Sequence, residues 1–180
     1  MAKIMKFAAI FTVVVTMLFV ALYLYWEIKL LLTLSITFAT IAYHLIMRLL
    51  VGWGMDLILH NRANYNARWF QVRPLEHRLY RKLPLKKWKR HIPSYDPSCF
   101  DPKLHSWDDI AQAMCQAELV HEVIILFSFL PILATILFGA FWAFLTTSLL
   151  AASFDTIFVV LQRYNRPRIV KLANKINKIG

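Results

Sequence analysis

Three titratable side chains share one face of a predicted helix and could do acid–base chemistry. Glu118, His121 and Glu122 are three and four residues apart, at the point where an apolar run begins. A histidine with a carboxylate one turn away can act as a general base, because the carboxylate orients the ring and stabilises the imidazolium. We therefore expect His121 to be a catalytic base and Glu118 to orient it. A water-exposed polar helix entrance would explain the same pattern without chemistry.

A second polar group follows the last apolar run. Residues 162–168 read Gln-Arg-Tyr-Asn-Arg-Pro-Arg, which holds more cations than the anchor of a membrane helix needs. Proline fixes its own φ and disfavours a helical conformation at Arg166, so a Tyr-Asn turn is predicted to end the membrane segment here. The residues expected to hold the phosphates of a donor or the polar head of an acceptor are Arg163, Tyr164, Asn165, Arg166 and Arg168.

Three titratable residues lie inside predicted membrane spans, where a charge is costly and suggests function. These are His44, Arg48 and Asp155. At 1.5 Å per residue, Arg48 lies about 8 Å and Asp155 about 10 Å from the same membrane surface. Matching depth predicts an ion pair, which with His44 would complete a polar substrate pocket. Purely structural pairing, or an arginine that extends to the membrane surface, is the alternative.

A run of cations in the middle of the chain could bind a phosphorylated donor. Lys86 and Lys89 are the predicted donor-binding residues, since the phosphates of a CoA-type thioester need cationic partners. The same charges would also serve to set the membrane topology. Further on, Ser106 and Asp109 form the pattern of a helix start, with the serine as the cap.

The apolar segments predict four membrane spans. Phe7 to Tyr25 contains 19 uncharged residues, close to the length that crosses a bilayer, and no signal-peptidase site follows it. Val123 to Leu161 would be about 58 Å long as one helix, so the chain must fold back, most simply at residues 139–142. The spans are expected at about residues 5–25, 30–53, 121–138 and 143–162. We expect an all-α membrane protein with two helical hairpins.

Composition and charge place the chain in a membrane. Of its 180 residues 59% are hydrophobic, and the mean hydropathy is +0.51. The net charge is +11, with 11 of the 21 lysines and arginines between Arg62 and Lys103 and six between Arg163 and Lys178. Because these cations flank apolar spans, they predict contact with phospholipid headgroups and argue against nucleic acid. The two cysteines form no metal-binding motif, so no metal is expected.

The charge distribution also predicts the topology. The positive-inside rule puts both termini and the basic segment 54–116 on the cytoplasmic side of a single membrane domain, residues 1–180. Within this segment, residues 69–88 place apolar side chains at helical spacing, which is typical of an amphipathic helix at the membrane surface. The tail, residues 163–180, is expected to lie along the inner leaflet. Four spans make a thin bundle, which is compatible with a homodimer.

Three sequence elements resemble one protein family. The heptapeptide 162–168 resembles the C-terminal signature of the glycosyl-4,4'-diaponeurosporenoate acyltransferase family of bacterial membrane proteins. Residues 117–121, Ala-Glu-Leu-Val-His, are similar to that family's Ala-Glu-Leu-Ile-His element. Residues 69–73, with the Trp-Lys pair at 88–89, resemble its tryptophan-rich segment. The resemblance covers about residues 69–172.

The resemblance implies an enzyme in a bacterial cell membrane. It would move a fatty acyl group from an activated donor to a sugar hydroxyl of a membrane glycolipid, which in that family is a glycosylated carotenoid. The donor would be an acyl-CoA or acyl-carrier-protein thioester, with no other cofactor. A non-catalytic membrane protein that binds lipid or organises a biosynthetic complex is the alternative, and it leaves Glu118 and His121 without a task. A lipid-modifying enzyme of another kind, such as a methyltransferase, is a third reading.

Overall fold

The computed structural model describes residues 2–85, 87, 97–139 and 141–176, and these form helices and loops without a strand. Four helical segments are long and apolar enough to cross a membrane, and the third of them, Trp107–Phe138, contains a break near its end. The long helices are α1 (Ala2–Trp26), α2 (Lys29–Leu59), α5 (Trp107–Phe127) and α7 (Phe141–Ile176). The prediction of an all-α fold with four helices able to cross a membrane is confirmed.

The first hairpin joins α1 to α2 through a turn of two residues. Glu27 adopts a left-handed backbone conformation with φ 53°, which reverses the chain before α2 begins. Many apolar side chains of α1 remain exposed, such as Phe7 at 72% and Met17 at 67%, as expected of a surface that faces lipid. At its other end α2 continues past Trp53 to Leu59, so it is longer than the predicted span.

The second hairpin contains a break in its first arm. After α5 ends, Leu130–Ala134 forms a 3-10 turn (η3) with Pro131 near its start, and α6 (Thr135–Phe138) follows. Proline lacks an N–H and cannot continue an α-helical ladder from the preceding turn, which accounts for the break. Gly139 then takes φ 67°, and α7 begins at Phe141. The chain reverses inside the predicted 139–142 segment.

Helix α7 corrects the prediction of a turn at Tyr164 and Asn165. The helix runs without interruption through residues 162–168, and Pro167 lies inside it. The preference of a pre-proline residue for extended backbone is overridden here, because Arg166 is anchored to other elements by its side chain. The Asn165 side chain donates to the carbonyl oxygen of Leu161 at 2.8 Å and so belongs to the helix as well. The described tail to Ile176 continues this helix.

The segment between the hairpins folds back on α7. It contains η1 (Arg68–Phe70), α3 (Pro74–Lys82) and η2 (Pro97–Phe100). The amphipathic helix expected within residues 69–88 is present as α3, but it is shorter than that range, because it begins at Pro74 and ends at Lys82; residues 88–96 lie outside the described part of the chain. Tyr80 and Leu85 are buried against Leu161 of α7.

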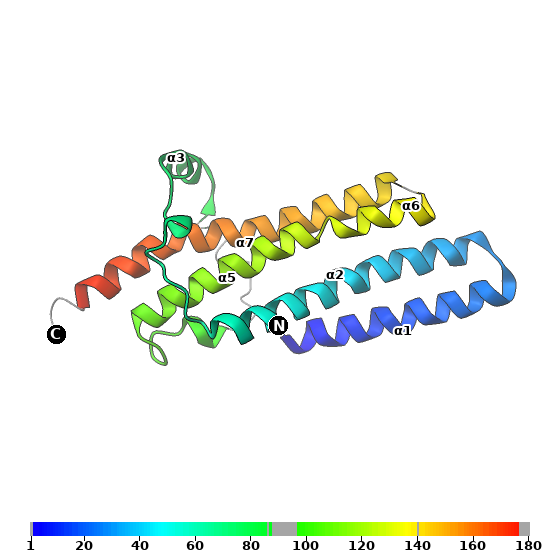
Figure 1. Cartoon of the computed structure of the whole chain (residues 1–180), viewed down its shortest axis with the longest axis horizontal. Coiled ribbons are helices and arrows are strands. Elements are labelled where there is room, and N and C mark those ends of the chain that lie inside the picture. Colours follow the sequence, from blue (N-terminus) through cyan, green and yellow to red (C-terminus); the bar gives the residue numbers. More distant parts are fainter. Residues whose placement is uncertain (1, 86, 88–96, 140, 177–180) are drawn as a thin grey trace.

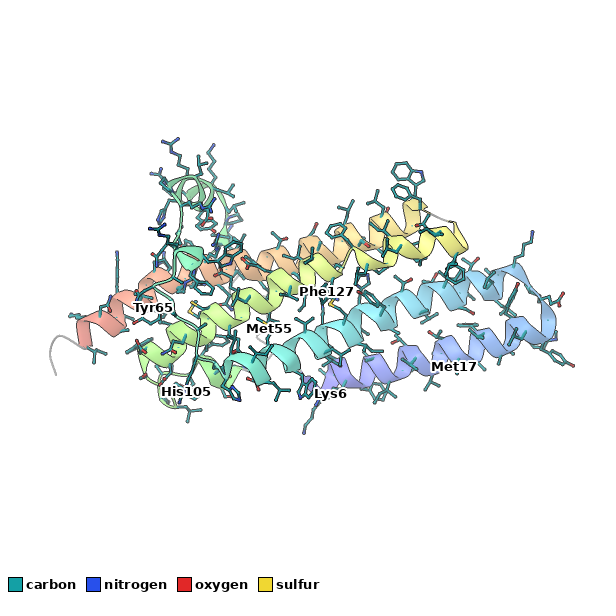
Figure 2. The ribbon with its side chains drawn as sticks, in the orientation of Figure 1. Lys6, Met17, Met55, Tyr65, His105 and Phe127 are labelled. Atoms are coloured by element: carbon teal, nitrogen blue, oxygen red, sulfur yellow. The ribbon has the colours of Figure 1, made fainter. Side chains whose placement is uncertain are left out.

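Both hairpin turns lie at one end of the molecule, and the basic segment lies at the other (Figure 1). The two hairpins meet along α2 and α5, where the Tyr43 hydroxyl donates to the Phe127 carbonyl oxygen at 2.8 Å. Figure 2 shows Tyr65 and His105 at the end with the basic segment, whereas Met17 lies along the apolar part of α1. We call the end that carries residues 60–85, 87 and 97–106 the basic end. Its cytoplasmic location remains a prediction.

Candidate functional site: a histidine–aspartate pair inside the bundle

A histidine, an aspartate and an arginine from three helices meet inside the bundle. His121 of α5 places its Nδ1 atom 2.9 Å from an oxygen of Asp155 on α7. Arg48 of α2 contacts the other oxygen of the same carboxylate. Asp155 is only 1% exposed, so both of its oxygens are held by protein groups away from solvent. The predicted pairing of Arg48 with Asp155 is present, and it extends to His121.

The contact with Asp155 determines which nitrogen of His121 can act as a base. An ionised carboxylate only accepts hydrogen bonds, so the imidazole donates its Nδ1–H to Asp155 and leaves the lone pair on Nε2. The ring also stacks on Phe158, with centroids 4.5 Å apart and planes at 9°. The side chain is 22% exposed, so the ring is fixed on two sides while part of its surface remains open.

The orienting partner of His121 is therefore Asp155, and the prediction that Glu118 fills this role is wrong. Both oxygens of Glu118 are occupied by arginines: Arg163 Nε lies 2.7 Å from Oε1, and Arg166 Nη1 contacts Oε2. Glu118 is fully buried, and two guanidinium groups compensate its charge in the way that a buried carboxylate requires. Glu118 and His121 do lie one turn apart on α5, as predicted, but each side chain binds to a residue of α7 and not to the other.

Arg163 and Arg166 use their donors within the protein. Besides Glu118, Arg163 binds Glu76 of α3 at 2.6 Å and the backbone oxygen of Trp69. Arg166 binds the backbone oxygen of Phe70, stacks over the Phe70 ring and is 2% exposed. These contacts attach the segment that contains η1 and α3 to α5 and α7. We therefore assign both arginines to the fold and not to a ligand.

The remaining predicted residues fall into four groups. His44 is buried in α2, and its two ring nitrogens have no hydrogen-bond partner within the described structure. Asn165 is bonded to the backbone of its own helix. Arg168 lies over the Tyr164 ring, 4.5 Å from its centroid, and donates to the Tyr164 hydroxyl at 2.7 Å. The predicted donor-binding residues Lys86 and Lys89 lie outside the described residues.

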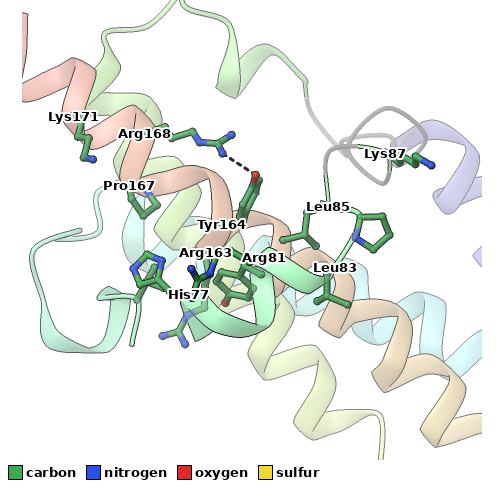
Figure 3. A pocket seen from close by; sticks show the side chains of 13 residues that line it. His77, Arg81, Leu83, Leu85, Lys87, Arg163, Tyr164, Pro167, Arg168 and Lys171 are labelled. Carbon is green, nitrogen blue, oxygen red and sulfur yellow. Dashed lines mark hydrogen bonds between the residues drawn. The ribbon is translucent and has the colours of Figure 1, made fainter. Parts of the chain in front are cut away.

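A pocket of about 590 Å³ lies between α3 and α7 at the basic end (Figure 3). Tyr164 and Arg168 line it, together with Tyr80 and Pro167. Burial, and then the nearby Glu76 carboxylate, raises the pKa of Tyr80 to about 12, so the Tyr80 hydroxyl keeps its proton. A second, smaller pocket lies between α1 and α2, with an apolar lining that includes Met17 and Tyr43. His121 lines neither of these two pockets.

Sequence reasoning missed the contribution of Glu76 and of two backbone carbonyls. Glu76 lies in α3, far along the chain from Arg163, with which it forms an ion pair at 2.6 Å. The sequence pattern that points to Glu76 is its position three residues after Arg73, which is typical of a helix start. There its carboxylate accepts a hydrogen bond from the Arg73 backbone N–H. The other two acceptors are the backbone carbonyl oxygens of Trp69 and Phe70. Every residue has such an oxygen, so the residue types do not predict these contacts.

Comparison with known proteins gives one match. Residues 66–175 match the sequence profile of the family described as glycosyl-4,4'-diaponeurosporenoate acyltransferase. This range begins before η1 and ends near the C-terminal end of α7, so it contains His121, Asp155 and Glu118 with both of its arginines. It leaves out α1 and also α2, the helix that contains Arg48 and His44. No curated protein and no solved structure matches the chain significantly.

Proposed function

Because the chain belongs to the glycosyl-4,4'-diaponeurosporenoate acyltransferase family, we propose that it transfers a fatty acyl group to a hydroxyl of a membrane glycolipid. The donor is an activated fatty acid in the form of a thioester of CoA or of acyl carrier protein. The acceptor is a glycosylated carotenoid-like lipid, a proposal that rests on the family's description alone. The protein works in a bacterial cell membrane, with both termini on the cytoplasmic side.

The observation that carries this proposal is the contact between His121 and Asp155, which is the arrangement that an acyl transfer to a hydroxyl needs. Nε2 of His121 removes the proton from the acceptor hydroxyl as its oxygen attacks the thioester carbonyl. A C–O bond forms and the C–S bond breaks. The imidazolium then returns the proton to the departing thiolate, which leaves as a free thiol, while the Asp155 carboxylate stabilises the transient charge on the ring.

Arg48 and His44 have supporting parts in this mechanism. Arg48 compensates the charge of Asp155, so the carboxylate can remain ionised at a depth where an unpaired charge would be too costly. His44 is buried without a hydrogen-bond partner in the described structure, and its backbone oxygen accepts from Arg48 at 3.1 Å. We propose that its imidazole binds a hydroxyl of the acceptor sugar, because an unsatisfied polar group in such a position is costly unless a ligand completes it. The acyl chain would lie between the apolar helices.

A second candidate function is supported by the contacts of Glu118. Arg163 and Arg166 form a closed and fully paired cluster with it, as expected of a protein that binds lipid or organises other enzymes without catalysis. The fact that His121 lines neither described pocket also supports this alternative. It leaves the fixed orientation of the His121 ring without a purpose.

Lipid analysis distinguishes the two functions. Lipids are extracted from cells with the gene, without it, and with a His121→Ala copy, and they are compared by mass spectrometry. If the protein is an acyltransferase, the deletion and the His121→Ala strains lack the same acylated glycolipid and accumulate its unacylated precursor. The matched control is His105→Ala, which removes an exposed histidine at the basic end and should restore the product. Restoration of the product by His121→Ala would refute the catalytic role.

A further inference from the structure

The pocket between α3 and α7 has an uneven distribution of charge. Its lining is apolar at Leu83 and Leu85 and basic at Arg81, Arg168 and Lys171, which we call the rim cations (Figure 3). His77 and Lys87 also line it, and none of the described lining residues is an aspartate or a glutamate. Cations that gather around a hollow without a carboxylate repel one another, so an anion that binds among them is stabilised.

The rim cations differ from the arginines that hold the fold together. Arg163 also reaches this pocket, but two glutamates and a backbone oxygen already occupy its donors. Within the described residues, Arg168 contacts the ring and hydroxyl of Tyr164 and forms no ion pair, so no described carboxylate compensates its positive charge. Arg81 and Lys171 form no ion pair within the described part of the chain. The pocket therefore offers guanidinium and ammonium groups that are ready for an anionic ligand.

The shape of the pocket limits the kind of anion. A volume of about 590 Å³ exceeds what an inorganic ion needs and falls within the range of small-molecule sites. One wall is built from Val72, Leu83 and Leu85, which suit a ligand whose phosphate is attached to a less polar chain. Arginine binds the oxygens of a phosphate through several N–H groups at once, and lysine adds a point charge.

We propose that this pocket is a binding site for a phosphate ester carried on an extended chain, with Arg168, Lys171 and Arg81 as its cationic partners. Two molecules carry such a group: the phosphopantetheine arm of the thioester donor and the headgroup of an anionic phospholipid. The first source rests on the proposed acyl transfer, because only a thioester donor brings that arm. The affinity of the pocket for phosphate can nevertheless be measured without turnover, so a failure here is distinct from a failure of the proposed catalysis.

The test measures ligand binding to the purified full-length protein in a zwitterionic detergent by titration calorimetry. The probes are 4′-phosphopantetheine and pantetheine, which differ only in the phosphate. A double variant, Arg168→Gln with Lys171→Gln, removes two cations of the rim. The matched control, Arg62→Gln with Lys175→Gln, removes two exposed cations that do not line the pocket, so the net charge changes equally.

We expect 4′-phosphopantetheine to bind the unaltered protein and to bind the rim variant at least about tenfold more weakly, because charge-assisted hydrogen bonds are lost. The control variant should stay within about twofold, and pantetheine should bind weakly to all three. A parallel arm uses nanodiscs of phosphatidylcholine with and without phosphatidylglycerol. Preference for phosphatidylglycerol that depends on the rim residues, without binding of 4′-phosphopantetheine, would identify a lipid headgroup as the source. Equal losses in the rim and control variants, or no binding of either phosphate, would overturn the proposal.

Discussion

The Nδ1 atom of His121 lies 2.9 Å from the Oδ1 atom of Asp155, across the interface between α5 and α7. Asp155 also contacts Arg48, so a single carboxylate joins helices of both hairpins. Because the imidazole is held by its Nδ1 atom and by the ring of Phe158, its remaining nitrogen has a fixed direction. The pairing of the two hairpins and the orientation of the candidate base therefore depend on the same residue.

We expect Asp155→Asn to lower the rate of acyl transfer by about three to four orders of magnitude. The amide can donate a hydrogen bond to Nδ1, which favours the tautomer with its proton on Nε2 and so removes the base. The measurement is the turnover number for the unacylated precursor in membranes, normalised to the amount of inserted protein. Asp56→Asn is the matched control, because the Asp56 carboxylate accepts a single hydrogen bond in the described structure, from the Gln116 side chain at 3.3 Å, and the variant should keep nearly full activity.

Asp155→Asn also leaves Arg48 without its carboxylate, so a loss of activity could reflect a loss of folding. The double variant Arg48→Met with Asp155→Asn separates the two effects, because it removes both charges. We expect this variant to recover most of the thermal stability that the single variant loses and to remain inactive. Recovery of activity together with stability would mean that Asp155 has only a structural role.

Glu118→Gln should destabilise the protein strongly without acting directly on the chemistry. It leaves Arg163 and Arg166 with less compensation, and breaking a buried pair of this kind costs about 3–5 kcal/mol. The measurement is thermal unfolding in detergent. Glu122→Gln is the comparison, since Glu122 accepts one bond from the Trp69 indole at 2.8 Å, and we expect a cost of about 1 kcal/mol or less. Similar costs for the two variants would contradict the structural role of Glu118.

Pro167→Ala should leave the fold intact and raise its stability. Pro167 lies inside α7 and has no N–H to donate to the carbonyl oxygen of Arg163, whereas alanine restores that bond and has a higher helix propensity. We expect a gain of up to about 3 kcal/mol in the free energy of unfolding, measured by thermal or denaturant unfolding. If the proline instead maintained a turn, its replacement would lower the stability.

The predicted topology can be tested with a membrane-impermeant maleimide on intact cells. Cys115 is buried, whereas Cys99 lies at the basic end with part of its side chain exposed, so labelling of the unaltered protein is expected at Cys99. We expect Cys99 to be labelled only after the cells are permeabilised, because the positive-inside rule puts the basic end in the cytoplasm. Glu27→Cys and Trp142→Cys, at the two hairpin turns, should be labelled from outside. Labelling of Cys99 in intact cells would reverse the predicted orientation.

The architecture could be predicted from the sequence, because the length of an apolar run and the charges that flank it are local properties of the chain. The apolar runs predicted the four long helices, and Gly139 marks the reversal inside the predicted segment. The Ser106 cap is also present, with the Asp109 backbone N–H donating to the serine hydroxyl at 3.1 Å. The turn predicted from Pro167 is wrong, because the long-range contacts of Arg166 outweigh the local preference of a pre-proline residue for extended backbone.

The partners within the site were only partly predictable. Arg48 and Asp155 could be matched because both are charges at similar depth in apolar helices, where few partners exist. The carboxylate of Glu118 could not be assigned in this way, because a histidine on its own helix and two arginines on another all compete for it. Helix spacing identifies which side chains share a face, but the relative rotation of α5 and α7 determines what each one meets.

Because α7 is one continuous helix, it fixes the distance between the residues at its two functional positions. Asp155 and Arg168 lie on this helix, 13 residues apart, so about 20 Å of helix axis separates the residue that orients His121 from the rim of the phosphate pocket. A molecule that placed its phosphate at Arg168 and its reacting carbonyl at His121 would have to span a comparable distance. A long, narrow donor meets this condition, and a compact one does not. Helix α7 would thus select the acyl donor by its length as well as by its charge.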